Sequence, residues 1–153
     1  MPLQKCNNQN LIMMDNKTFD SKKMNILIIE DEGDISLILN LMLKKEDIEI
    51  EHVTTLAKAA TFLKEQSTDI VIIDNQLPDG FGLEYIKEIK SSYPLIKIIM
   101  ITGNTDTTDK ATAIENGADI FLAKPFTKEQ IQKSLENVQA ISLCDSLLKD
   151  DKL

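Results

Sequence analysis

The sequence predicts an α/β fold with a five-stranded parallel sheet, doubly wound, and helices on both faces. Short apolar runs alternate with amphipathic segments five times between residues 24 and 140. Such alternation is typical of parallel strands that are joined by helices. The chain of 153 residues is 42% hydrophobic, which suits one globular domain with a core of its own.

The first unit of this pattern is a strand at residues 25–30, followed by a helix over 33–45. NILIIE is a continuous apolar run that ends in an acidic residue, as expected for a buried strand of a parallel sheet. Asp34 is the expected N-cap of the helix. The residues expected to face the core, at helical spacing, are Ile35, Ile38, Leu39 and Met42.

The second and third units follow the same pattern. IEIEHV at residues 48–53 alternates like an edge strand, and a helix over 55–66 comes after it. DIVIID at 69–74 is the third strand, and the third helix covers 83–92 after a turn. The residues of the second helix expected on one apolar side are Ala57, Ala60 and Leu63.

The last two units complete the predicted sheet. IKIIMIT at 96–102 is the fourth strand, and the helix after it ends at Gly117, a natural left-handed C-cap. This fourth helix is expected over 106–116. DIFLA at 119–123 is the fifth strand, and the final helix begins near Thr127.

The apolar stripe of the final helix is longer than the sheet requires. It continues in steps of three or four residues through Ile131, Leu135, Val138, Ile141, Cys144 and Leu148. We expect the helix to reach about Leu148 and its extra turns to form part of a homodimer or target interface, because no sheet lies beneath them. A frayed tail is the alternative, supported by the terminal KDDKL and by the poor stability of unpacked helices.

Charge and composition divide the chain into three parts. Residues 1–23 carry four Lys and two Asp, are rich in Asn and Gln, and are expected to form a flexible N-terminal extension. The folded domain is expected over residues 24–141, and residues 142–153 form the helix extension and tail. Residues 24–140 hold eleven Lys against twenty acidic residues, so the acidity of the chain belongs to the folded domain.

The same composition excludes several classes of protein. The net charge is −8 and all 17 basic residues are Lys, so no Arg is present to read base edges, and direct nucleic-acid binding is not expected. Cys6 and Cys144 lie far apart, and His52 is the only His, which leaves little support for a zinc site or a disulfide framework. No apolar run is long enough for a signal peptide or a membrane span, so we expect a cytoplasmic protein.

Polar side chains follow four of the five predicted strands. Glu30 and Asp31 come after the first strand, Asp74 ends the third, Thr102 ends the fourth and Lys124 follows the fifth. Ligands of open doubly wound sheets bind at the carboxyl ends of the strands, so these side chains are expected to meet in one crevice. Each alone has a simpler explanation as a helix cap, a turn residue or an exposed residue. Their order and placement together favour a single site.

Four segments carry a family resemblance: ILIIEDE, VIIDNQLPDGFGLE, MITGN and IFLAKPF. Over about residues 24–140 the chain resembles the receiver domain of response regulators in two-component signalling. The resemblance implies the flavodoxin-like strand order 2-1-3-4-5. It also implies that Asp74 is the phosphoacceptor, Lys124 the lysine before a proline, Thr102 the switch hydroxyl and Phe121 the switch aromatic residue.

A Mg²⁺ site is implied by the same resemblance. Asp31, Asp74 and the backbone carbonyl of Gln76 are the expected direct ligands, and Glu30 is expected to act through a water molecule. The first acid of this pair is more often Asp in the family, so the longer side chain of Glu30 is a departure. Charge also favours a cation, because the three carboxylates count −3 and Lys124 counts +1, which leaves −2 for one Mg²⁺ to neutralise with oxygen ligands.

The implied function is that of a phosphoacceptor response regulator in a phosphorelay. Asp74 takes a phosphoryl group from a histidine kinase or a histidine phosphotransfer protein in a Mg²⁺-dependent reaction. The protein is not an enzyme acting on other substrates, since it catalyses only its own phosphorylation and slow dephosphorylation. Phosphorylation switches a protein-binding surface formed by the fourth helix, fifth strand and fifth helix, which an unknown target protein reads. Few residues follow the expected last helix, which indicates a stand-alone receiver.

Other functions fit the residues less well. A receiver fold that has lost phosphorylation and acts as a scaffold is the strongest alternative, although the acceptor, acids, Thr and Lys are all present. A haloacid-dehalogenase-like phosphatase also uses an Asp nucleophile with Mg²⁺, but it needs a second acid at the position of Gln76. A flavodoxin-like FMN carrier needs a hydroxyl-rich loop where this chain has EDEGD, and GFG at 80–82 lacks the third glycine of a dinucleotide fingerprint.

Overall fold

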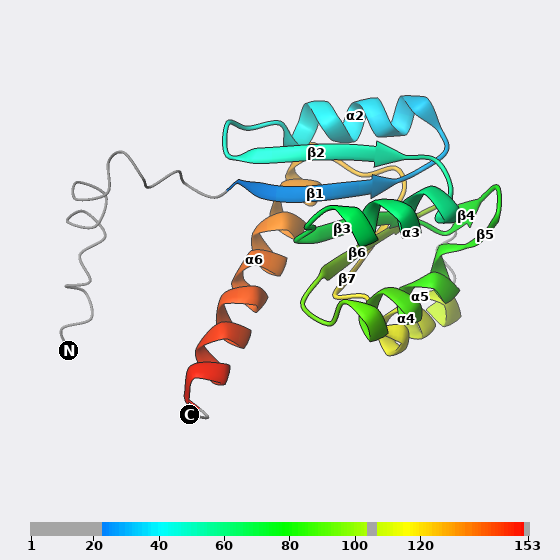
Figure 1. Cartoon of the computed structure of the whole chain (residues 1–153). Helices are drawn as coiled ribbons and strands as arrows, with labels where there is room; N and C mark the ends of the chain where they lie inside the picture. The colour runs from blue at the N-terminus through cyan, green and yellow to red at the C-terminus, as the bar shows by residue number, and fades with distance from the viewer. Residues whose placement is uncertain (1–22, 104–106, 152–153) are drawn as a thin grey trace.

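A computed structural model describes residues 23–103 and 107–151, and side chains within these ranges except those of residues 107 and 142–151. The strands of its main sheet are all parallel and stand in the order β2-β1-β3-β6-β7 (Figure 1). This is the predicted fold class and strand order. The strands are β1 Met24–Ile29, β2 Ile48–Val53, β3 Ile70–Asp74, β6 Lys97–Thr102 and β7 Ile120–Ala123.

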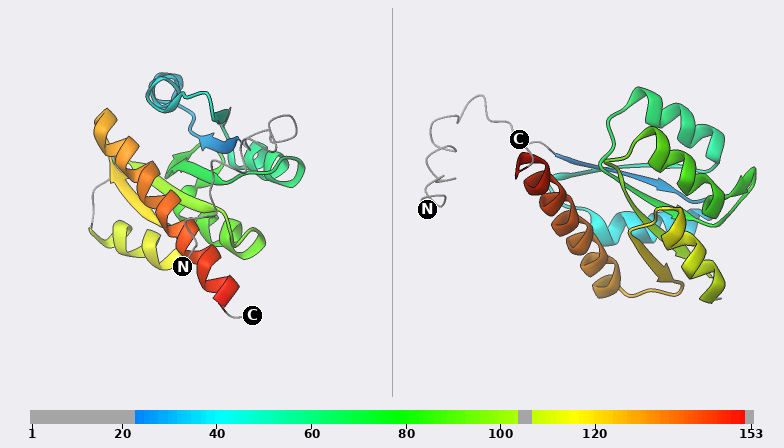
Figure 2. Two further views of the ribbon diagram at one scale, coloured as in Figure 1. Left: turned by 90° about the vertical axis from the view of Figure 1, so that its left-hand side faces the viewer. Right: turned by 90° about the horizontal axis from the view of Figure 1, so that it is seen from below.

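Helices cover both faces of the sheet, as predicted (Figure 2). One face packs against α2 and α6, and the other against α3, α4 and α5. Their bounds are α2 Gly33–Leu43, α3 Leu56–Glu65, α4 Gly82–Ser92, α5 Thr107–Asn116 and α6 Lys128–Asp151.

The core lies on both sides of the central strands, because these strands are apolar at nearly every position. All five residues of β3 are buried, and so are the last four residues of β1. Burying an aliphatic side chain of this size contributes about 1.5–3 kcal/mol. The strands therefore anchor the fold and hold their carboxyl ends in fixed positions.

The apolar faces of α2 and α3 differ from those predicted. In α2, Ser36 is buried together with Leu39 and Leu43, whereas Ile38 is 40% exposed. In α3, Ala59 and Leu63 are buried, Ala60 is partly buried and Ala57 is exposed. Both helices are too apolar for residue type to define one face, so packing against the sheet decides which residues are inside.

The first residues of α2 correct one prediction, and those of α3 show a cap that was not predicted. Asp34 lies inside the first turn of α2, and the N-cap position belongs to Glu32, whose side chain makes no cap hydrogen bond. For α3, Thr55 is the N-cap, and its Oγ1 accepts a hydrogen bond of 3.1 Å from the backbone N–H of Lys58.

A small hairpin that the sequence analysis missed lies between β3 and α4. It consists of β4 Gln76–Leu77 and β5 Gly80–Phe81. Gly80 has φ = 155°, a conformation that side-chain-bearing residues rarely adopt. Asp79 of its turn accepts hydrogen bonds from the backbone N–H groups of Leu56 at 2.8 Å and Ala57 at 3.0 Å, so the hairpin also caps the start of α3.

The structure describes the backbone of the predicted extension of the last helix, but not the predicted N-terminal extension. The backbone of α6 is helical to Asp151, so the predicted continuation past residue 140 is confirmed. Its first turns bury Ile131, Leu135 and Val138, and the lower part of the helix extends beyond the sheet (Figure 1). The side chains of Cys144 and Leu148 lie outside the described part, as do residues 1–22, so the expected N-terminal extension stays a prediction. Within the described residues, no helix combines the length and the apolarity needed to cross a bilayer.

Candidate phosphoacceptor site

The carboxyl ends of four strands bring the predicted polar residues together. Glu30 and Lys124 directly follow β1 and β7, while Asp74 and Thr102 are the last residues of β3 and β6. Glu30, Asp74 and Thr102 are 2%, 7% and 3% exposed, and the backbone N–H of Lys124 donates to the Thr102 carbonyl at 2.9 Å. A cavity of about 680 Å³ opens there, lined by Asp31, Glu32, Asp74, Gln76, Leu77, Pro78, Thr102, Gly103 and Lys124.

The start of α4 fixes the position of Asp74. A Cβ atom at Gly82 would lie 2.2 Å from the backbone oxygen of Asp74, so only glycine lets the helix approach this closely. The N–H of Gly82 donates to the Asn75 carbonyl at 2.7 Å, and that of Leu83 donates to Asn75 Oδ1 at 2.9 Å. These two hydrogen bonds hold Asn75, the residue directly after Asp74, against the start of α4.

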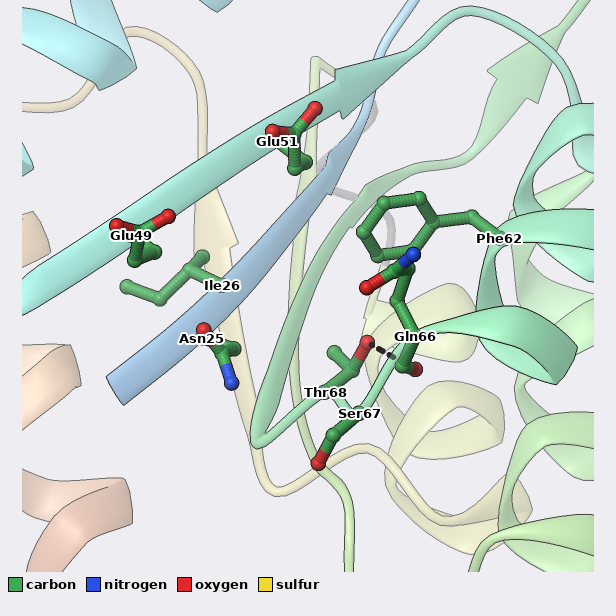
Figure 3. Close-up of a pocket in the computed structure, with 8 residues that line it drawn as sticks. All are labelled: Asn25, Ile26, Glu49, Glu51, Phe62, Gln66, Ser67 and Thr68. Carbon is green, nitrogen blue, oxygen red and sulfur yellow. Dashed lines mark hydrogen bonds between the residues drawn. The ribbon is translucent and has the colours of Figure 1, made fainter. Parts of the chain in front are cut away.

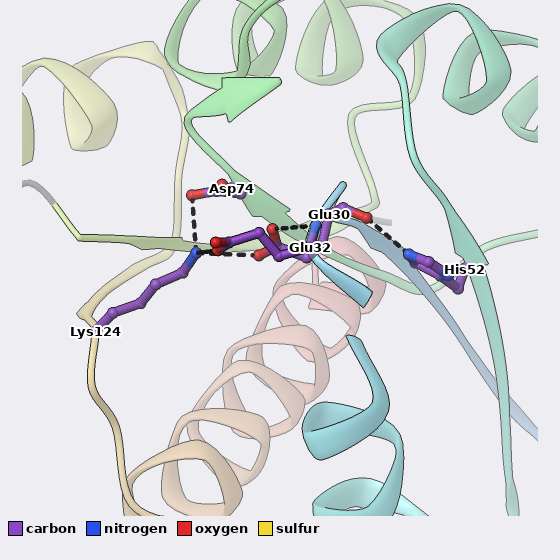
Figure 4. Close-up of polar contacts among 5 residues, drawn as sticks. All are labelled: Glu30, Glu32, His52, Asp74 and Lys124. Carbon is purple, nitrogen blue, oxygen red and sulfur yellow. Dashed lines mark hydrogen bonds and ion pairs between the residues drawn. The ribbon is translucent and has the colours of Figure 1, made fainter. Parts of the chain in front are cut away.

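Lys124 is the centre of the charged contacts in this cavity. Its Nζ lies 3.2 Å from Glu30 Oε1, 3.3 Å from Glu32 Oε1 and 3.5 Å from Asp74 Oδ1 (Figure 4). The side chains of Glu30 and Asp74 are buried, whereas that of Glu32 is 62% exposed. One ammonium group thus joins the carboxyl ends of β1, β3 and β7.

Burial makes the negative charge of this site costly. Removal from water raises the pKa of Glu30 and of Asp74 above their usual values, and the ammonium of Lys124 counteracts only part of this rise. For Lys124, burial lowers the pKa, but Asp74 and Glu30 raise it more, so its net pKa lies above the usual value. The site therefore favours a positively charged lysine and disfavours charge on its two buried carboxyl groups.

The acidic residues are close enough to hold one cation. Carboxylate oxygens of Glu30, Asp31 and Asp74 all lie within 4.8 Å of one another. Hard oxygen donors of this kind suit Mg²⁺ better than zinc. The structure adds Glu32 to the charge count, because it contacts Lys124. The site then holds four carboxylates and one ammonium group, so its net negative charge is larger than the predicted −2.

Of the remaining predicted residues, Gln76 lines the cavity and Phe121 does not. Phe121 lies in β7, partly buried against the core cluster on the side of α3, α4 and α5. Met100 pairs with Phe121 and Thr102 pairs with Ala123, so Phe121 lies two residues before the level of Thr102 in the sheet. The structure brings the acids, Lys124, Thr102 and Gln76 together, and places Phe121 on the strand beside that of Thr102.

Two residues of this region were missed by sequence reasoning. Glu32 was given no role in the sequence analysis, although it contacts Lys124. His52 Nε2 lies 2.7 Å from the backbone oxygen of Glu30 (Figure 4). Because a carbonyl only accepts, this contact requires the tautomer with hydrogen on Nε2. The sequence did contain a signal for His52. It stands near the end of the alternating strand β2, which pairs with β1, and β1 ends directly before Glu30.

A second cavity lies toward the amino ends of β1 and β3, away from these residues. It has about 400 Å³ and is lined by Asn25, Ile26, Glu49, Glu51, Phe62, Gln66, Ser67 and Thr68 (Figure 3). No lysine is among its lining residues, and its two carboxylates point from the edge strand β2. It lacks the combination of acid cluster, lysine and strand-end hydroxyl that lines the first cavity.

Comparison with known proteins agrees with this geometry. Residues 26–136 match the family described as "Response regulator receiver domain", so the chain belongs to the receiver domain family of response regulators. It is 31% identical over 111 residues to the KDP operon transcriptional regulatory protein KdpE of Escherichia coli (strain K12). That alignment covers 72% of this chain and 49% of KdpE, so the chain spans about half the length of this relative.

Solved structures give the same result. The beryllofluoride-activated NtrC4 receiver domain dimer superimposes with a TM-score of 0.74 and 30% identity, over 77% of this chain and 98% of that one. NtrX from Brucella abortus gives a TM-score of 0.79 and 26% identity, over 86% of this chain and 30% of that one. A CheY-like receiver domain protein from Methanospirillum hungatei JF-1 gives 0.76 at 22% identity, over 81% and 99% of the two chains, a likeness in fold alone.

Proposed function

We propose that Asp74 accepts a phosphoryl group from a phosphorylated histidine kinase or histidine phosphotransfer protein. The observation that carries this proposal is the position of Asp74, which ends the central strand β3 in a cavity shared with Lys124, Thr102 and two further acids. A carboxylate oxygen of Asp74 attacks phosphorus, and the P–N bond of the phosphohistidine breaks. Its electron pair stays on the imidazole nitrogen, and the product is an aspartyl phosphate.

The neighbouring side chains have distinct roles in this proposal. Lys124, already 3.5 Å from Asp74 Oδ1, stabilises negative charge on the phosphoryl oxygens. Thr102 donates its hydroxyl to one of these oxygens. Glu30, Asp31, Asp74 and the backbone carbonyl of Gln76 would hold Mg²⁺, which supplies positive charge where the transferred group would otherwise be repelled by the acids.

A surface beside the cavity fits the phosphodonor protein. α2 begins directly after Glu32, and three of its apolar side chains are strongly exposed: Leu37 at 59%, Ile38 at 40% and Leu41 at 67%. Exposed apolar groups of this size, next to a charged site, are typical of protein contacts. We propose that the histidine kinase or phosphotransfer protein contacts this face of α2.

The output of the proposed reaction is a change of shape at the other side of the cavity. Phosphorylation draws the hydroxyl of Thr102 inward and gives Phe121 space to rotate toward it. The surface of α5, β7 and α6 would then bind a target protein, and the long α6 offers a further surface for a homodimer. A cytoplasmic location and the lack of direct nucleic-acid contact stay predictions from the sequence.

Phosphorylation with a small donor tests this function. The full chain is incubated with acetyl phosphate and Mg²⁺, and the acyl phosphate is then reduced with borohydride, which converts a phosphorylated Asp into homoserine. Peptide mass spectrometry locates the residue at which homoserine has replaced Asp. We expect one site, Asp74, and loss of the modification with EDTA or in Asp74→Asn. Asp79→Asn is the matched control, because Asp79 is a nearby exposed carboxylate outside the cavity, and it should be modified like the wild type. An unmodified wild type with an intact fold would favour the scaffold alternative.

A further inference from the structure

Lys124 has three carboxylate partners, and one of them is a residue without an assigned role. The contacts are to Glu30 at 3.2 Å, Glu32 at 3.3 Å and Asp74 at 3.5 Å. An ammonium group has three N–H donors and no acceptor. Two of these donors form hydrogen bonds, one to Glu30 and one to Glu32, while Asp74 lies farther away, at the distance of an ion pair. A phosphoryl oxygen that approaches Asp74 therefore competes with these carboxylates for Lys124.

Glu32 is the partner that Lys124 gives up most easily. Its side chain is 62% exposed, against 3% for Glu30 and 8% for Asp74. Water can replace the ammonium at an exposed carboxylate, and exposed ion pairs are weak and screened by salt. The buried Glu30 carboxylate has no comparable access to water. Asp74 is the group that receives the phosphoryl group, so its contact changes with the reaction itself.

The backbone holds Glu32 in this position. Glu32 is the N-cap residue of α2, with φ = −87° and ψ = 112°, yet its side chain makes no hydrogen bond to the helix. Its carboxylate turns to Lys124 instead, while its backbone N–H donates to Glu30 Oε2 at 3.1 Å. Glu30 Oε1 in turn accepts from Lys124. Glu30, Glu32 and Lys124 thus form a closed ring of contacts beside Asp74 (Figure 4).

We propose that Glu32 is a positioning residue that restrains Lys124 in the unphosphorylated protein and releases it to the phosphoryl group. The proposal rests on Asp74 being the phosphoacceptor. Glu32 competes with the incoming phosphoryl oxygen for one N–H of Lys124, so it slows phosphorylation. Breaking this contact should free the lysine and raise the rate of phosphorylation, without any change at Asp74 or at the acids beside it.

The first experiment measures the contact without phosphodonor. Side-chain ¹H–¹⁵N spectra of the full-length unphosphorylated protein report the ammonium of Lys124, assigned with Lys124→Arg. We expect Glu32→Gln to shift this signal. Asp34→Asn removes the same charge from the first turn of α2 and should leave the signal in place. An unchanged Lys124 signal in Glu32→Gln would overturn the proposal, whether or not Asp74 proves to be phosphorylated.

The second experiment measures the phosphorylation rate with acetyl phosphate. Glu32→Gln should be faster than the wild type by about two- to fivefold, which is the weight of an exposed ion pair. Glu32→Asp keeps the charge but shortens the side chain by one methylene, so it should resemble Glu32→Gln if the contact matters. If Glu32→Asp behaves like the wild type, or Asp34→Asn is as fast as Glu32→Gln, the effect is one of general charge and the proposal is wrong. A wild type that is not phosphorylated overturns the proposed function and, with it, the release of Lys124.

Discussion

Asp74 and Asp79 are close in sequence, but their carboxylates lie in opposite surroundings. Asp74 is buried at the end of β3, and removal from water raises its pKa. Asp79 is exposed in the next turn, and two backbone N–H groups of α3 lower its pKa. At neutral pH the charge of Asp74 therefore weakens the fold, whereas that of Asp79 strengthens it. Charge that is unfavourable for stability is concentrated at the proposed phosphoacceptor, while the adjacent turn uses charge to cap a helix.

The largest effect is expected where the support of Asp74 is removed. Gly82→Ala places a Cβ atom 2.2 Å from the Asp74 carbonyl, a backbone group that cannot rotate away. We expect a loss of about 1–3 kcal/mol in the free energy of unfolding, as for other overpacked sites, together with slower phosphorylation. Chemical denaturation measures the first effect. Gly33→Ala is the control, because nothing lies within 4 Å of its Cβ position, and its stability should not fall.

The sign of the stability change should differ between the two carboxylates. Asp74→Asn removes a charge whose burial is unfavourable, so it should raise the melting temperature at pH 7 by about 2–4 °C, the equivalent of about 1 kcal/mol. Mg²⁺ should raise the melting temperature of the wild type more than that of Asp74→Asn, because the variant lacks one of the proposed ligands. If Asp74→Asn is less stable than the wild type without Mg²⁺, the buried charge of Asp74 does not weaken the fold.

Asp79→Asn should lower the melting temperature at pH 7 by a few degrees. The pKa of Asp79 is lower in the folded than in the unfolded protein, so its contribution is present above the unfolded value, near pH 4, and disappears as the pH falls through the folded value. Thermal melts from about pH 7 to about pH 2.5 should therefore show the wild type and Asp79→Asn converging at the acid end. A constant difference over this range would mean that charge is not the cause.

The smallest effect concerns Tyr85, a partly buried side chain that lies outside the acid cluster. Burial raises the pKa of Tyr85 to about 12, as it raises that of Asp74, and Glu88 contributes. Tyr93→Phe leaves Tyr85 as the only tyrosine, and the chain has no Trp, so absorbance at about 295 nm reports its ionisation alone. We expect a midpoint well above the usual value for tyrosine but below that of the wild type, because the variant lacks the Tyr93 charge that contributes to the raised pKa of Tyr85. Because the folded pKa is raised, the neutral ring stabilises the fold below about pH 10 and this contribution disappears as the pH rises toward 12.

Some parts of the fold follow from the sequence because a single local pattern determines them. Four of the strands are continuous apolar runs that fit a sheet covered on both faces, and β2 alternates like an edge strand, so the places of the strands and their parallel direction were predicted. The strand order came from the family resemblance. The cavity residues Glu30, Asp74, Thr102 and Lys124 were found because each stands at a strand end. The inward faces of α2 and α3 were partly wrong, because these helices carry apolar residues on several sides and only packing selects among them.

Contacts between segments that are far apart in the sequence were the other feature that could not be predicted. Nothing local in the sequence indicates that Asp79 caps α3, since the two are joined only through the hairpin of β4 and β5. The contact of Glu32 with Lys124 joins residues 92 positions apart. His52 reaches the backbone of Glu30 only because β2 pairs with β1. Such contacts depend on the register of the strands and on the reach of individual side chains, and the periodicity of the sequence determines neither.

The edge strand β2 also bears on how two copies of the protein could meet. An edge strand presents unpaired backbone groups that can bond to an identical strand of another molecule and lead to aggregation. On β2, Glu49 and Glu51 point to the same side, so a second copy paired edge to edge would bring four carboxylates into one cross-strand cluster. Only Glu49 has a nearby compensating charge among the described contacts, from Lys23 at 3.0 Å. β2 therefore resists self-pairing, and the sheet can keep an open edge in a crowded solution without growing into a fibril.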